Sequence, residues 1–154
     1  MSLTITANTP LVIERLQQIA ARLGDLKAPL GAIGMEMESR ISARFESRSD
    51  PQGHPWAPWL PSTRRRYPKD GHGTILDRYG DMLASLSHKA NEKSVTIGFG
   101  QPYAAYHEWG TKHMERRGLL FADPDAGTLG SGDEAAVLNV LDGFLRQAER
   151  KKKN

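Results

Sequence analysis

Residues 95–121 read VTIGFGQPYAAYHEWGTKHMERRGLLF, and this stretch decides the fold. Its first five residues alternate apolar with small or polar side chains, which is the period of a strand that buries one face. Proline is favoured at the first position of a helix and glycine just after the last. We therefore expect a short helix between Pro102 and Gly110, with Tyr103, Tyr106 and Trp109 on one side of it.

The same alternation predicts the rest of a small antiparallel sheet. Residues 86–90 alternate, a polar Asn-Glu-Lys sequence follows, and residues 95–99 alternate again, which indicates a hairpin. Residues 3–7 alternate in the same way at the N-terminus, and the apolar residues 119–121 are expected to form a short buried strand.

Three to four helices are expected to flank this sheet, which makes the fold class α+β. An apolar stripe follows Thr9 and Pro10, an N-cap and first helical residue, and ends at Gly24. A second stripe covers residues 30–45, and because of its two early glycines we expect the helix to begin near Met35. A short helix is expected from Asp81. The last begins at a capping box formed by Ser131 and Glu134.

The chain organisation follows from its length and punctuation. We expect one domain over residues 1–150 and a basic disordered tail over residues 151–154. Residues 47–74 contain five prolines and are expected to form a long loop without regular structure. This loop carries Trp56 and Trp59, so it is either a docking loop ordered by a partner or a loop folded onto its own core.

The charge of the chain is concentrated in clusters. The formal net charge is +3, from 21 basic and 18 acidic residues. Arg64, Arg65 and Arg66 form one cluster, and four more basic residues lie at positions 150–153. Removal of those four leaves 17 basic against 18 acidic residues, so the body of the protein is not basic. No apolar run is long enough for a membrane span, and without cysteine there is no disulfide or thiol nucleophile.

The residues that suggest catalysis lack the spacing that catalysis needs. His107 and Glu108 begin like the zinc motif H-E-x-x-H, but Thr111 stands at the second histidine position and His113 lies beyond Gly110. Other histidines and aspartates form no spaced motif. We therefore expect no catalytic residue, no metal and no cofactor. The alternative is a nucleic-acid-binding or nuclease accessory protein that uses the cluster of Arg64, Arg65 and Arg66 beside the tryptophans.

The order of these parts resembles a known family. A strand ending in Val95, Ile97 and Gly98 is followed by Tyr103, Ala104, His107, Glu108, Trp109 and Gly110, and then by Arg117 and Leu120. Upstream stand Gly53, Pro55 and Trp56, then the arginine cluster, then Ile75, Leu76, Gly80 and Leu83. This pattern is similar to the phage virion morphogenesis family, the tail-completion proteins of Mu-like and P2-like phages, and to the related HK97-type tail-component family. The chain departs from it at Glu115, Gly118 and Leu119.

The resemblance implies a non-enzymatic structural protein of a phage or prophage. Such proteins act in tail completion or head–tail joining, as rings for which a hexamer is favoured, on tail tube or head-connector proteins. It implies a place in the virion, and in the host bacterial cytoplasm during assembly, without a membrane or direct contact with nucleic acid. Trp56, Trp59, Arg64, Arg65 and Arg66 are expected to form a docking arm. The expected assembly core is Tyr103, Tyr106, His107, Trp109 and Gly110, and Arg116 and Arg117 are expected to meet acidic groups of a neighbouring subunit.

Overall fold

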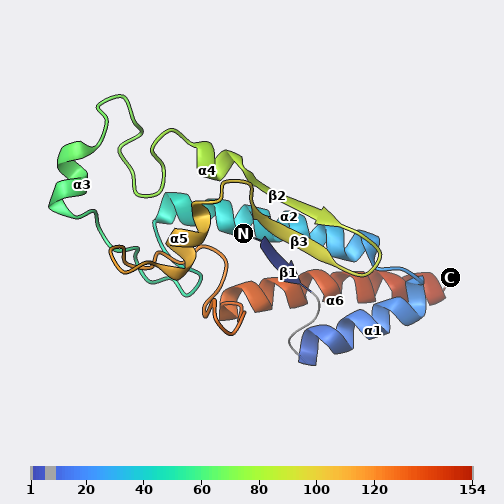
Figure 1. Ribbon diagram of the computed structural model, residues 1–154. Helices are drawn as coiled ribbons and strands as arrows, with labels where there is room; N and C mark the ends of the chain where they lie inside the picture. The colour runs from blue at the N-terminus through green and yellow to red at the C-terminus, as the bar shows by residue number, and fades with distance from the viewer. Residues whose placement is uncertain (1, 6–9, 154) are drawn as a thin grey trace.

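The computed structural model describes residues 2–5 and 10–153. In chain order the elements are β1 (Ser2–Ile5), α1 (Pro10–Leu23), α2 (Lys27–Ser47), α3 (Pro61–Arg66), α4 (Asp81–Ala84), β2 (Leu86–Ala90), β3 (Val95–Phe99), α5 (Ala104–Trp109) and α6 (Ser131–Lys153). The predicted α+β class is confirmed (Figure 1).

The sheet has three antiparallel strands in the order β1-β3-β2. Ile97 at the centre of β3 pairs with Leu3 of β1 on one side and with His88 of β2 on the other. The predicted central hairpin is therefore confirmed, and the N-terminal strand is confirmed as far as Ile5; residues 6 and 7 of that prediction lie outside the described residues. The predicted strand over residues 119–121 is wrong, because that segment is irregular and pairs with no strand.

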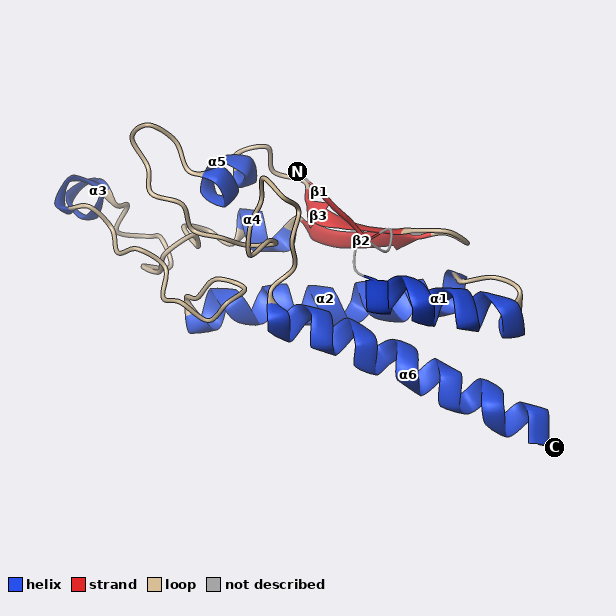
Figure 2. Ribbon diagram, turned by 90° about the horizontal axis from the view of Figure 1, so that it is seen from below, coloured by secondary structure: helices blue, strands red, loops and turns tan. Residues whose placement is uncertain are grey.

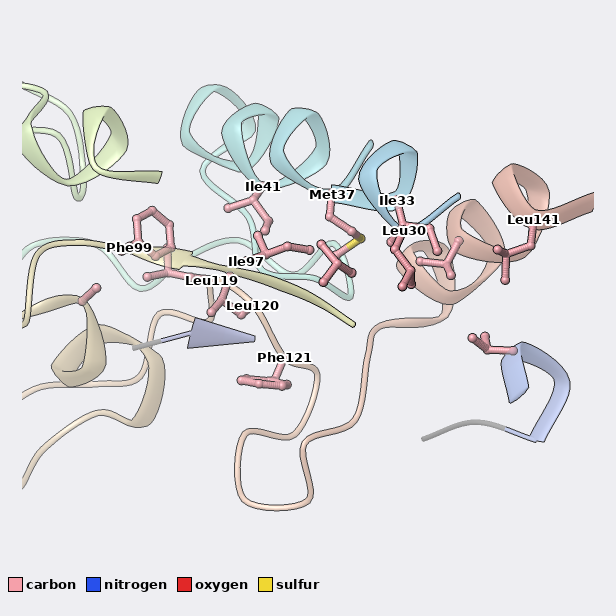
Figure 3. Close-up of a cluster of buried hydrophobic side chains, with 14 of the residues drawn as sticks. Leu30, Ile33, Met37, Ile41, Ile97, Phe99, Leu119, Leu120, Phe121 and Leu141 are labelled. Atoms are coloured by element: carbon pink, nitrogen blue, oxygen red, sulfur yellow. The ribbon is translucent and has the colours of Figure 1, made fainter. Parts of the chain in front are cut away.

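The three long helices α1, α2 and α6 lie on one side of the sheet (Figure 2). The inner face of α2 carries Leu30, Ile33, Met37 and Ile41, all fully buried at helical spacing, and this face packs toward Ile97 of β3 (Figure 3). Leu141 of α6 extends the same core beyond Leu30 and Ile33 (Figure 3). Within residues 10–153, no helix combines the length and apolar character that crossing a membrane requires.

Helix α2 begins at Lys27, so the prediction that it starts near Met35 is wrong. The glycines that argued against an earlier start do not disrupt the helix because tertiary contacts stabilise it. Gly34 in particular is needed for packing. A Cβ atom there would lie 2.3 Å from Cδ2 of His88 on β2, and only a glycine lets the strand approach the helix this closely.

Other corrections concern helix boundaries. The loop over residues 47–74 contains α3, which begins with Pro61 at a position where proline suits a helix. The prediction of a disordered tail over residues 151–154 is wrong for residues 151–153, because helix α6 continues to Lys153. Lysines are favoured at the C-terminus of a helix, where the helix dipole is negative. The predicted capping box is replaced by a bond from the Glu134 N–H to the Gly130 carbonyl (2.9 Å). The predicted N-cap Thr9 lies outside the described residues.

Two glycine substitutions in α2 test the close approach of helix and strand. Gly34→Ala places a methyl group against the His88 ring and is expected to lower the free energy of unfolding by about 1–3 kcal/mol. Gly31→Ala is the matched control, because nothing lies within 4 Å of its Cβ position, and it is expected to stabilise the helix by about 0.5–1 kcal/mol. Urea unfolding measures both, and equal effects would contradict this packing.

Candidate docking site

The irregular segment of residues 118–121 is held by one buried carboxylate. Glu108 of α5 is completely buried, and it accepts three consecutive backbone N–H groups. Its Oε2 atom accepts from Leu119 (2.5 Å) and Leu120 (3.0 Å), and its Oε1 atom accepts from Phe121 (2.8 Å). These N–H groups are therefore not available to a sheet ladder, which is why the predicted strand does not form.

The carbonyl groups of the same segment are bound by side chains from elsewhere in the chain. Trp56 Nε1 donates to the carbonyl of Gly118 (3.0 Å), and Arg44 of α2 donates to that of Leu119 (2.6 Å). Arg116 donates to the carbonyl of Phe121 (2.6 Å), and its guanidinium lies 3.6 Å from the Glu108 carboxylate. Both the polar backbone and the buried charge of Glu108 are thereby compensated.

Trp56 belongs to the core, so its expected role in a docking arm is wrong. Its ring is 5% exposed and meets the ring of Phe45 edge-on, with 5.6 Å between the centroids. The sequence left two alternatives for this loop, a docking loop or a loop folded onto its own core. At Trp56 the loop is folded onto the core. The sequence could not show this, because the bond partner at Gly118 lies 62 residues away.

The chain beyond Trp56 leaves the core and forms what we call the arm, residues 57–69. In Figure 1 its helix α3 stands apart from the sheet and the long helices. No residue of α3 is buried, and Arg64, Arg65 and Arg66 are all exposed. Trp59 stacks on Tyr67 across the arm, with 4.4 Å between the ring centroids.

The two arginines after α5 bind their own chain. Arg117 donates to the carbonyls of Ala57 (2.8 Å) and Pro58 (3.0 Å), which fixes the base of the arm to the body. Arg116 holds Phe121 and also donates to the carbonyl of Glu108 (2.7 Å). Both arginines therefore have a role inside the subunit, and the expectation that they meet acidic groups of a neighbouring subunit stays a prediction.

An open groove of about 1230 Å³ lies between the arm and α5. We call it the groove. Its apolar and aromatic lining comes from Trp59, Leu60, Tyr67, Ile75, Leu76, Tyr79, Met82, Tyr103, Tyr106 and Met114. Several of these side chains are exposed, including Tyr106 at 59% and Leu60 at 60%. Trp109, expected beside Tyr103 and Tyr106, is exposed but does not line the groove.

His107 forms part of the groove wall. Its Nδ1 atom is buried without a hydrogen-bond partner, while His113 is exposed. Burial, together with the smaller effect of the positive charge of Arg117, lowers the pKa of His107 from 6.5 to about 4. The imidazole is therefore neutral near pH 7. Gly110, with a φ of 73°, ends α5 and sends the chain away from it, as predicted.

The sequence analysis named Tyr103 and Tyr106 as candidate assembly residues, and both line the groove. It did not find the residues of the opposite wall. Tyr79, Ile75 and Met82 come from the segment before β2, and no local pattern connects that segment to α5. The sequence also missed the buried pair of Asp133 with Arg44, which lie 89 residues apart. Acidic residues are common in the first turn of a helix, so the position of Asp133 gave no signal of this pair.

Exposed tyrosines are enriched at the surfaces where proteins bind one another. Residues 8–145 match the phage virion morphogenesis family, and the chain belongs to that family.

Two curated relatives align with most of the chain. The Mu-like prophage FluMu G protein 2 of Haemophilus influenzae is 27% identical over 87% of this chain and 86% of its own length. The putative capsid assembly protein G of Escherichia phage Mu is 26% identical over 70% of this chain and 73% of its own. No solved structure gives a significant match.

The Glu108 carboxylate can be tested by substitution. Glu108→Gln keeps the shape but turns one acceptor oxygen into an N–H donor that faces a backbone N–H. We expect a loss of about 2–3 kcal/mol in the free energy of unfolding, the size of lost hydrogen bonds to a charged group. Glu115→Gln is the control, because Glu115 is exposed. Urea unfolding measures both variants. If Glu108→Gln lowers the free energy of unfolding no more than Glu115→Gln does, the Glu108 carboxylate does not stabilise the segment of residues 118–121.

The buried imidazole predicts a pH dependence. The pKa of His107 falls from 6.5 to about 4 on folding, so the unfolded chain takes up this proton first as the pH falls. The contribution of His107 to stability is thus complete above pH 6.5 and is lost between pH 6.5 and 4. We expect His107→Gln to flatten the slope of unfolding free energy in that window, while His113→Gln leaves it unchanged. Identical slopes in all three proteins would refute the prediction.

Proposed function

We propose that this protein is a non-enzymatic structural component that completes a phage or prophage tail or joins head and tail. In this role it forms a ring and binds tail tube or head-connector proteins. Its membership of a virion morphogenesis family supports the assembly role. The observation that carries the docking role is the groove, whose aromatic side chains remain exposed in the single chain.

The groove receives a segment of a protein partner. Tyrosines bring large contact area and a hydroxyl group at a low cost in side-chain entropy, and they are enriched at protein interfaces. The charges of the lining are balanced: Arg78, Lys112 and Arg117 are matched by Asp77, Asp81 and Glu115. A nucleic-acid channel requires an excess of positive charge, so the balance favours a protein partner over DNA or RNA.

This function places the protein in the host bacterium while virions assemble and in the finished virion afterwards. Among the described residues, no group of three or more histidine, aspartate or glutamate side chains is arranged to hold a metal ion. The proposed function needs none, because binding and assembly require shape and charge complementarity only.

Complementation of a phage or prophage that lacks the gene tests this function. The double variant Tyr103→Ala, Tyr106→Ala removes two exposed aromatic side chains from the groove without touching the core. Loss of such an anchor costs about 2 kcal/mol of binding, roughly thirtyfold in affinity. We expect fewer infectious particles, with unjoined heads and tails in electron micrographs.

The matched control is Met35→Ala, because Met35 is 67% exposed on α2 and does not line the groove. It is expected to leave the titre unchanged, and thermal unfolding checks that all variants fold. Normal particles from the double tyrosine variant would count against docking through the groove. Normal particles from a phage without the gene would count against any role in assembly.

A further inference from the structure

The arm carries charge of one sign. Between Asp50 and Asp70 the chain has no acidic residue, and the arm contains Arg64, Arg65, Arg66 and Lys69. All four side chains are exposed, and none forms an ion pair within the described chain. Arg117 fixes the base of the arm to the body through the carbonyls of Ala57 and Pro58.

The opposite charge is gathered in a second projection, residues 122–128, which we call the finger. No Lys, Arg or His occurs between Arg117 and Arg146, whereas five acidic residues do. Two of these five, Asp133 and Asp142, are paired with arginines of α2 and α1. The exposed Asp123 and Asp125 of the finger form no ion pair in the described chain.

The finger is preformed. Backbone bonds join Asp123 and Thr128 in both directions (3.0 and 3.4 Å), and the Asp123 carboxylate accepts the N–H groups of Asp125 and Ala126. In Figure 3 the chain leaves Phe121, turns back in a closed loop and continues toward α6. The fixed shape keeps the Asp125 carboxylate at the surface and lowers the entropy cost of binding.

We propose that the arm of one copy of this protein binds the finger of a second copy. Helix α3 is an unpartnered helix whose positive charges match the negative charges of the finger, and guanidinium–carboxylate pairs are strong and directional. The arm and the finger lie at separate places on the subunit, as the colours of Figure 1 show. Contacts between two different surfaces of the same chain repeat head to tail and close into a ring when the rotation permits.

This inference rests on the proposed ring and names the two surfaces that form it. It explains why α3 buries nothing in its own subunit. A polyanion could also bind the arm, but it would leave the charge of the finger without a role. A second copy gives both surfaces a partner.

The absence of cysteine makes a crosslinking test clean. One full-length batch carries Ser62→Cys in the exposed arm and a second carries Ala126→Cys in the exposed finger. The two are mixed and treated with a short flexible bis-maleimide. We expect the mixed arm–finger dimer to exceed either same-site dimer. Gln147→Cys, exposed on α6, replaces the finger cysteine as a control and is expected to give no dimer with the arm.

Charge reversal then identifies the contact. In the arm batch, the triple variant Arg64→Glu, Arg65→Glu, Arg66→Glu is expected to lower the yield of the mixed arm–finger dimer about tenfold. Lys151→Glu with Lys152→Glu and Lys153→Glu makes the same change in net charge at the end of α6 and is expected to leave it unchanged. In the finger batch, Asp125→Lys with Thr128→Lys also lowers the yield with the wild-type arm. The reversed arm and reversed finger together are expected to restore it.

Each outcome decides the inference. The inference is supported if the mixed dimer is lost when either the arm or the finger carries reversed charges, and is restored when both carry them. The absence of a mixed dimer, or one that persists in the reversed arm, overturns it. Salt-sensitive DNA binding by the arm without a mixed dimer also overturns it, in favour of a nucleic-acid surface. The proposed function is tested separately by phage titre. If the arm–finger contact is not found but the titre still falls in the double tyrosine variant, the proposed function stands and only this inference fails.

Discussion

The groove side of this protein depends on one interaction, the Glu108 carboxylate buried under residues 118–121. A buried charge costs several kcal/mol unless hydrogen bonds and a countercharge compensate it. Here three backbone N–H groups and the guanidinium of Arg116 do so. The same hydrogen bonds fix the course of residues 118–121, an irregular segment that is not part of the sheet. That path places Arg117 where it binds the base of the arm, and the arm forms one wall of the groove.

A second buried charge connects this side to the long helices. Asp133, in the first turn of α6, is bound by Arg40 and Arg44 of α2. Arg44 also donates to the carbonyl of Leu119, so one guanidinium touches both α6 and the segment that Glu108 holds. The two ion networks therefore join the helix layer and the groove side into one hydrogen-bonded body. Polar networks of this kind specify a unique arrangement only when every member is satisfied.

Elements with a clear local period were predictable from sequence. The hairpin of β2 and β3 follows from strict alternation, and α1 follows from an apolar stripe between a proline and a glycine. Prediction failed where a distant residue decides the local structure. The apolar residues Leu119, Leu120 and Phe121 suggest a strand by composition, but a glutamate eleven to thirteen residues earlier takes their N–H groups. The start of α2 was misplaced because the fit between Gly34 and His88 is invisible in a single sequence.

The sequence by itself determined the α+β class, the central hairpin, the long helices, the aromatic side of α5 and the resemblance to a phage assembly family. These properties depend on residue spacing, which the chain carries from end to end. Only the tertiary structure decided that Trp56 lies in the core while the arginines beyond it stand free on the arm. It also decided that the groove exists, since its walls come from segments separated along the chain. The physical reason is that buried polar groups must find partners, and those partners are chosen by the fold rather than by neighbours in sequence.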